Sequence, residues 1–359
     1  MTEHDTSSTA RAPDLPRREL IGAWLLLTGY GLMVLAFVWD QQWHFDVGPD
    51  NFFTAPHMMM YTGTATIGLT SLFMVLARTW RREDRPTSGA AVTVFRIFRA
   101  PAPFLVGGAS ASAFLVYGVT DLWWHTIYGF DLQGASWAHN GLLLSMGVAA
   151  VATVMAFAAW RGRGSARWGF AIAGGIGVAG STITVATTAD LSGVVFVLAV
   201  AGLCGFALAL FAGVTRSPAW LLAIGAVFTG FQLLCLAYSP LATRIYADLL
   251  DQPLRDNARG VPSLVFMFPA AFPVVAGVAA WVVWLAKRRG THPPRAMALI
   301  GAVAGIGGGI GIAVMAFTEQ FDPLAIAVVV ATPVCGAVAA RFGWQCAALL
   351  PAFATGRAA

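Results

Sequence analysis

The chain has 359 residues, of which 58% are hydrophobic and only 11% are charged. Soluble domains carry about 25% charged residues, so this composition excludes an ordinary soluble domain. Together with a mean hydropathy of +0.71 it indicates an integral membrane protein in contact with membrane lipid. The formal net charge of +5 does not require a nucleic-acid partner, because the positions of the basic residues follow membrane topology.

The predicted elements begin after a polar N-terminal tail, residues 1–18, which is rich in Ser, Thr, Pro and charge and is expected to be disordered. No cleavable signal peptide is expected, because the first apolar run is long enough to span a membrane. The apolar runs that follow predict an all-α, polytopic membrane bundle of about ten transmembrane helices. In chain order these are 20–40, 56–78, 102–122, 137–160, 168–188, 191–214, 218–239, 261–286, 296–317 and 323–340.

The spans divide into two regions. Residues 19–165 are expected to hold four helices, built from two parallel helix-hairpin repeats, 19–80 and 101–162. Residues 166–342 hold six helices whose role the sequence does not indicate. Gly-rich runs in this second region, such as GAVAGIGGGIG, indicate close packing of helices through small residues. Residues 343–359 are expected to form a C-terminal tail.

The placement of basic residues predicts the orientation. With both termini cytoplasmic, 19 of the 22 Lys and Arg residues lie on the cytoplasmic side, and only Arg244, Arg255 and Arg259 lie outside. This positive-inside pattern is typical of a bacterial-type inner membrane or plasma membrane. The three outer arginines belong to Ala242–Gly260, which is expected to form a short interfacial helix or a lid. Asp46 is expected to be a solvated acid in an outer loop.

Four of the six histidines lie in two short stretches, each at the outer end of a predicted span. The first stretch has the spacing D-x3-H-x12-H and contains Asp40, His44 and His57. The second has the spacing D-x3-H-x13-H and contains Asp121, His125 and His139. Both stretches are predicted on the same side of the membrane, so any metal sites they form are expected near the outer face.

These residue types at this spacing predict metal ligands. Asp40 and His44, four residues apart, lie on one face of a helix. His57 opens the next span, because Pro56 before it favours the first turn of a helix. A helix hairpin therefore brings one carboxylate and two imidazoles around one ion, provided that their ligand atoms lie within about 6 Å of one another. Such ligands suit copper, zinc or iron, and three of them leave a coordination position open.

A polar belt at the membrane surface is the alternative, since Asp, His and Trp side chains also gather there. Its aromatic girdle would consist of Trp39, Trp43, Trp123, Trp124 and Trp137. The repetition of a three-ligand set in matching topology favours the metal sites. Met60 shares the face of His57 and is a candidate soft ligand for copper(I), although lining an apolar surface is the more ordinary role for methionine.

The run from Asp40 to Tyr61, DQQWHFDVGPDNFFTAPHMMMY, resembles the copper-site segment in the C subunit of the particulate methane and ammonia monooxygenases. That segment carries Asp-x3-His on one membrane helix, then a Phe-Thr-Pro run, a histidine that opens the next helix, and a tyrosine. The matching positions here are Asp40, Trp43, His44, Phe53, Thr54, Pro56, His57 and Tyr61. The proline lies one residue closer to the histidine than in the family, and the second stretch lacks the Phe-Thr-Pro run.

The resemblance implies that Asp40, His44 and His57 are copper ligands. It also implies a monooxygenase, or a subunit of one, that oxidises a small apolar substrate with O2 beside other membrane subunits or further copies of the chain. No catalytic residue beyond the ligands is assigned. A non-catalytic copper protein for uptake, storage or delivery stays open, as does a zinc-dependent intramembrane hydrolase. A di-haem cytochrome and an interaction protein with a polar belt are the further alternatives.

Overall fold

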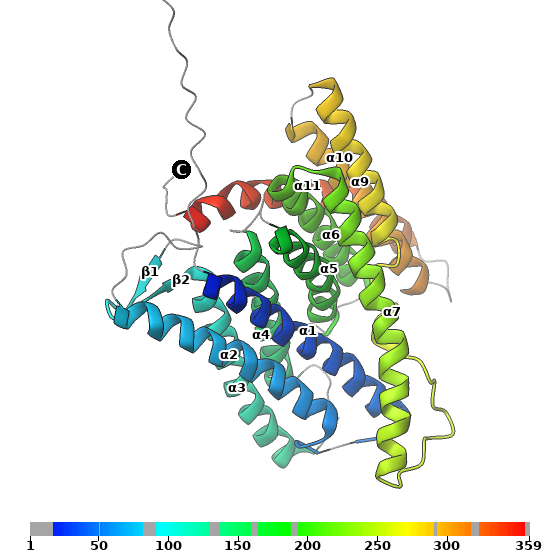
Figure 1. The fold of residues 1–359 in the computed structure, drawn as a ribbon. Helices are drawn as coiled ribbons and strands as arrows, with labels where there is room; N and C mark the ends of the chain where they lie inside the picture. Colours follow the sequence, from blue (N-terminus) through cyan, green and yellow to red (C-terminus); the bar gives the residue numbers. More distant parts are fainter. Residues whose placement is uncertain are drawn as a thin grey trace, which may run out of the picture.

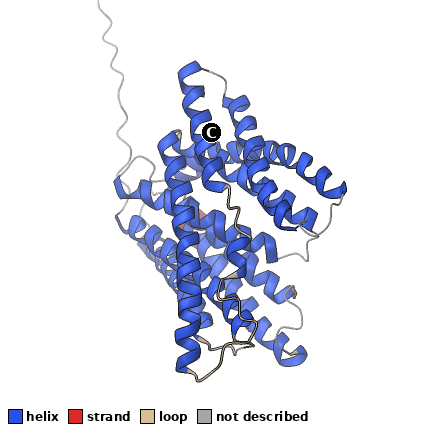
Figure 2. Cartoon of the chain, turned by 90° about the vertical axis from the view of Figure 1, so that its right-hand side faces the viewer, coloured by secondary structure: helices blue, strands red, loops and turns tan. Residues whose placement is uncertain are grey.

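The computed structural model describes residues 17–49, 51–81, 91–129, 136–158, 164–187, 193–290, 293–316 and 323–355. Within these ranges the chain forms a bundle of helices and one short β-hairpin (Figures 1 and 2). The helices are α1 (Arg17–Asp46), α2 (Ala55–Arg81), α3 (Ala102–Tyr128), α4 (Trp137–Ala158), α5 (Gly164–Thr187), α6 (Gly193–Thr215), α7 (Pro218–Leu249), α8 (Ser263–Phe266), α9 (Phe272–Arg289), α10 (Pro293–Ala316) and α11 (Pro323–Thr355).

Eight of the described helices, α1 to α7 and α11, are long and apolar enough to cross a membrane. The predicted helical membrane bundle is therefore confirmed, whereas two of the ten predicted spans are not among these eight. The predicted span 261–286 is instead divided into α8 and α9, because Pro269 and Pro273 lack the backbone N–H groups that a continuous helix needs. α10, with 24 residues, coincides with the predicted span 296–317.

Helix α7 is longer than predicted. It continues through Pro240 to Leu249, so the predicted interfacial segment begins as the last turns of a long helix. Those turns are stabilised by packing on α1, because the ring of Tyr246 lies 4.9 Å from that of Trp43 and 6.0 Å from that of Trp39. The rest of the segment is a loop, residues 250–262, that returns toward the end of α1.

Helix α11 runs to Thr355, although the sequence predicts a span ending near residue 340 and a tail from residue 343. The Ala-rich sequence after Arg341 favours helix continuation. Gly343 allows a close approach to α6, because a Cβ atom there would collide with the backbone oxygen of Phe206. α6, α10 and α11 pack mainly on one another, and they also contact α5 and α9.

A β-hairpin that the sequence did not predict joins α2 to α3. β1 (Ala91–Val94) pairs antiparallel with β2 (Phe98–Pro101), with Val94 opposite Phe98. The β-branched run Val92–Val94 is the local signal for it. The turn places Phe95 and Arg96 at positive φ, 53° and 59°.

α1 lies at the centre of the half of the bundle that contains the predicted metal ligands. It contacts α2, α4, α5 and α7, and Figure 1 shows it crossing the middle of the molecule. It meets α2 at a very close crossing: a Cβ atom on Gly63 would lie 2.5 Å from the backbone oxygen of Gly29. Contacts of α2 with α3 and of α3 with α4 complete a four-helix group. This packing places the end of α1 beside the start of α2.

Candidate metal centre

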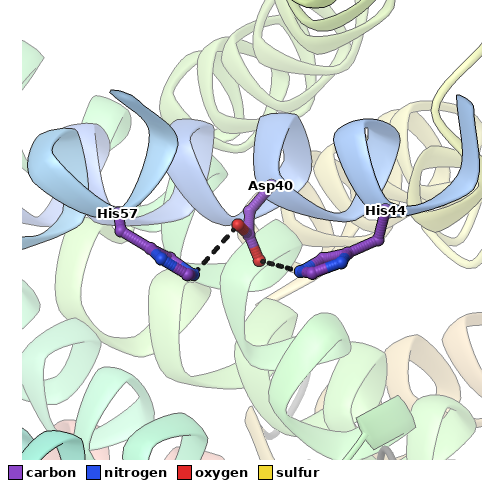
Figure 3. Close-up of side chains that lie close together, drawn as sticks. All are labelled: Asp40, His44 and His57. Carbon is purple, nitrogen blue, oxygen red and sulfur yellow. Dashed lines mark ion pairs between the residues drawn. The ribbon is translucent and has the colours of Figure 1, made fainter. Parts of the chain in front are cut away.

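Asp40, His44 and His57 meet where α1 approaches the first turn of α2 (Figure 3). Oδ1 of Asp40 lies 3.1 Å from Nε2 of His57, and Oδ2 lies 3.7 Å from Nε2 of His44. The carboxylate is 5% exposed and stands between the two rings. One ligand atom from each residue lies within 4.8 Å of the others, which satisfies the limit expected for a single ion. We call these residues the first triad.

Asp121, His125 and His139 form a second triad of the same construction, between the last turns of α3 and the first turn of α4. Oδ2 of Asp121 lies 3.5 Å from Nε2 of His125, and Oδ1 lies 3.2 Å from Nδ1 of His139. The two imidazole rings meet edge to face, with centroids 5.4 Å apart. All six predicted ligands are therefore brought together in two groups of three.

A hydroxyl group three residues before the second histidine is shared by both triads, and sequence reasoning did not assign it a role. Thr54 precedes the first residue of α2, and its Oγ1 lies 3.2 Å from Nδ1 of His57. Ser136 precedes α4; its Oγ accepts the backbone N–H of His139 at 3.1 Å and lies 3.3 Å from Nδ1 of that ring. Both residues occupy the N-cap position, where Ser and Thr are preferred. The pattern [ST]-x-x-H is the sequence signal that identifies them.

Two of the histidine rings are oriented by backbone carbonyl groups. Nδ1 of His57 lies 3.0 Å from the oxygen of Asn51, and Nδ1 of His125 lies 3.0 Å from the oxygen of Gly129. A carbonyl oxygen only accepts hydrogen bonds, so Nδ1 of each ring carries a proton. Histidines that bind metals commonly donate their second ring N–H to such an acceptor.

The proton positions leave a specific electrostatic requirement at each carboxylate. In a neutral imidazole protonated at Nδ1, Nε2 presents a lone pair, and in His57 that lone pair faces Oδ1 of Asp40 at 3.1 Å. Two lone pairs at this distance repel, so the contact requires either a second proton on the ring or a cation between the two atoms. Oδ1 of Asp40 and Oδ1 of Asp121 are buried and accept no hydrogen bond from the described residues. The first triad therefore fits a bound cation. The second fits one through His125, whose Nε2 faces Oδ2 of Asp121 at 3.5 Å while its Nδ1 carries the proton.

Both triads line one cavity of about 70 Å3. The remaining lining is mostly apolar or aromatic and includes Phe37, Phe114, Leu143, Met60 and Met146. A cavity needs about 10–15 Å3 of such volume to hold one water molecule, so this cavity holds several small groups. The two groups of ligands thus face a common, small and largely apolar space.

Other residues near the ends of the spans are placed differently from expectation. Trp39 and Trp43 are 7% and 2% exposed and pack against α7, so they do not form a lipid-facing girdle. Trp123 and Trp137 are about half exposed and can contact lipid at the membrane surface. Met59 does not face the triad, since its sulfur accepts a hydrogen bond from Tyr238 at 3.5 Å.

Asp46 is not the solvated loop acid that the sequence predicts. It is 2% exposed, and its carboxylate accepts the backbone N–H groups of Arg259 at 2.8 Å and Gly260 at 3.2 Å, and the side chain of Gln42. Its backbone oxygen accepts the N–H of Arg255 at 2.8 Å. Asp46 therefore anchors the loop 250–262 one turn beyond the first triad. The burial follows from a segment about 200 residues later in the chain, which local sequence does not indicate.

No known protein family, curated protein or solved structure matches this chain. The two triads and the short stretch that resembles the monooxygenase segment are therefore the features that indicate a function.

Proposed function

We propose that the chain is an integral membrane copper protein that oxidises a small apolar substrate with O2, alone or as one subunit of a monooxygenase. The observation that carries this proposal is the shared cavity: two Asp-His-His triads and two methionines line one small apolar space. We further propose that the cavity lies near the outer face of the membrane, as the distribution of basic residues predicts.

The ligand chemistry favours copper over zinc. Imidazole and carboxylate groups suit copper(II), whereas the thioether groups of Met60 and Met146 suit copper(I). A cavity that offers both kinds of ligand fits a metal that cycles between two oxidation states. Zinc has no redox chemistry and gains nothing from the methionines.

The residues of the chain then have separate roles. Asp40 and Asp121 would neutralise part of the charge of the ions. Each would also hold the two imidazoles of its triad in position through its two oxygens. The carbonyl oxygens of Asn51 and Gly129 would keep Nε2 of His57 and His125 directed at the metal. Copper, when bound, would supply redox chemistry toward O2. Three protein ligands in each triad leave room for a further ligand.

The lining of the cavity limits the substrate. Phe37, Phe114 and Leu143 provide an apolar surface, and the volume of about 70 Å3 favours a small molecule beside the ions. A small apolar substrate is concentrated in the hydrocarbon core of a membrane, so the surrounding bilayer would supply it. The aromatic and aliphatic walls would also exclude bulk water from the ligands.

A non-catalytic copper-holding role is the second candidate. The two complete ligand groups favour it, because each would hold an ion whether or not a substrate enters the cavity.

Isotope labelling separates the two roles. Full-length protein in lipid nanodiscs would be loaded with copper, supplied with a reductant and exposed to 18O2 and a small alkene. Labelled oxygen in the product supports the oxygenase, provided that the zinc-loaded protein and the double variant Asp40→Asn/Asp121→Asn give no labelled product. Bound copper without any labelled product contradicts the oxygenase and leaves the copper-holding role.

A further inference from the structure

A second, larger cavity lies at the other end of the bundle from the metal ligands. It has a volume of about 450 Å3 and is lined by residues of α5, of α6 and of the start of α7, among them Arg167, Arg216, Ser217 and Trp220. Since His139 lies at the start of α4, the end of α4 and the start of α5 are at the opposite end of the bundle. No acidic side chain lines the cavity among the described residues. The guanidinium groups of Arg167 and Arg216 are the charged groups of its described lining.

The backbone of the α6–α7 turn places one of these arginines unusually. Arg216 has a φ of 48°, in the left-handed region that glycine normally occupies, and its N–H donates to the oxygen of Ala212 at 2.9 Å. Glycine would be the less strained residue there, so the arginine side chain is present at a conformational cost. Strained positions of this kind cluster at functional sites. Ser217, the residue before α7, makes no capping hydrogen bond with its side chain, although it lines the same cavity.

Aromatic residues place the cavity at the level of lipid headgroups. Trp220 in the cavity wall packs edge to face on Trp168, with ring centroids 5.3 Å apart, and Trp168 is 55% exposed. Tryptophan is enriched where a membrane helix meets water. We therefore expect the cavity, which lies beside the ends of three helices long enough to span, to be at the depth of phospholipid phosphates.

We propose that this cavity binds a phosphate group and that the phosphate belongs to an anionic phospholipid. Arginine pairs with phosphate through two parallel N–H donors, and Arg167 and Arg216 supply two such groups to one cavity. The hydroxyl of Ser217 adds a neutral donor. Basic pockets between membrane helices on the cytoplasmic side bind anionic headgroups in this way. The site does not depend on the metal centre or on its reaction.

The test compares lipid binding by four full-length proteins: wild type, Arg167→Gln, Arg216→Gln and Arg289→Gln. Arg289 is an exposed residue at the end of α9 and does not line the cavity. Its substitution therefore removes a positive charge without altering the site. Binding of phosphatidylglycerol and of phosphatidylcholine would be titrated by native mass spectrometry in detergent. A separate titration with inorganic phosphate distinguishes a lipid from a soluble source. Size-exclusion profiles and melting temperatures verify that each variant is folded.

The expected result is that each cavity variant binds phosphatidylglycerol about fivefold more weakly than wild type, while Arg289→Gln and the phosphatidylcholine titrations change little. Saturable binding of inorganic phosphate with the same arginine dependence, and no preference between the two lipids, would keep the phosphate site but overturn the lipid assignment. Equal binding of phosphatidylglycerol by all four folded proteins, with no phosphate binding, overturns the proposal.

Discussion

Nε2 of His57 lies 3.1 Å from Oδ1 of Asp40, across the interface between α2 and α1. The other nitrogen of the same ring is directed at a backbone oxygen and carries a proton. The contact with the carboxylate therefore requires a positive charge, either a second proton or a metal ion. The second triad lines the same cavity, so the structure concentrates four imidazoles and two carboxylates in a space of about 70 Å3. Metal ions satisfy this group without placing four imidazolium rings side by side.

Substituting Gly63→Ala is expected to damage the first triad selectively. The added Cβ atom would lie 2.5 Å from the backbone oxygen of Gly29, so α1 and α2 must separate. Overpacking of this kind costs about 1–3 kcal/mol. We expect the protein to bind about one metal ion fewer per chain while the second triad remains occupied. The control is Gly230→Ala, where no atom lies within 4 Å of the added group. Unchanged metal content in Gly63→Ala would show that the crossing of α1 and α2 does not position Asp40 and His57.

Removing the N-cap hydroxyls is expected to weaken metal binding more than folding. Thr54→Val removes a group that contacts Nδ1 of His57, the nitrogen turned away from Asp40, and Ser136→Ala removes the hydroxyl that accepts the backbone N–H of His139. Loss of an N-cap costs about 1 kcal/mol of stability, whereas loss of a group that orients a ligand lowers metal affinity about 10- to 100-fold. Competition titrations with a chelator measure the affinity, and Thr54→Ser is expected to restore it.

Thr62→Val serves as the matched control for the hydroxyl substitutions. Thr62 lies on α2, and its hydroxyl donates to the oxygen of Met58 without contacting either triad. Its metal affinity is expected to equal that of wild type. An equal loss of affinity in Thr62→Val and Thr54→Val would attribute the effect to the stability of α2 and not to the orientation of His57.

Asp46→Asn is expected to release the loop 250–262. The substitution replaces a carboxylate oxygen that accepts a backbone N–H of this loop, which costs about 1–3 kcal/mol. Trypsin cleaves after arginine, so faster cleavage at Arg255 and Arg259 reports the release directly. Asp248→Asn, an exposed position at the end of α7, is the control. Identical cleavage rates in the two variants would contradict an anchoring role for Asp46.

The local part of each triad is predictable from the sequence because it depends on helix geometry alone. Asp40 and His44 share a face through their spacing of four residues, and Pro56 places His57 in the first turn of α2. The Thr54 contact is equally local, and the pattern of a hydroxyl residue three positions before the histidine indicates it. The general architecture follows from hydropathy, which predicts long apolar helices.

The long-range part of the site could not be predicted, because it depends on packing between distant segments. Only the contacts of α1 with α4 and of α2 with α3 make the two triads line one cavity. The burial of Asp46 depends on the loop 250–262, and the extension of α7 depends on the contact of Tyr246 with Trp43. Hydropathy also predicts one span where the structure has α8 and α9, because apolar composition does not indicate the backbone interruption at Pro269.

The most direct test of the central claim is the metal content of the purified protein. Copper, zinc and iron per chain would be measured for wild type, His44→Ala, His125→Ala and, as a control, His292→Ala, with electron paramagnetic resonance on the same samples. We predict bound copper with nitrogen hyperfine splitting in wild type and His292→Ala, and less copper when either triad histidine is removed. Zinc without a copper signal would contradict the assignment of the metal. No bound metal in any sample after reconstitution would contradict the metal centre itself.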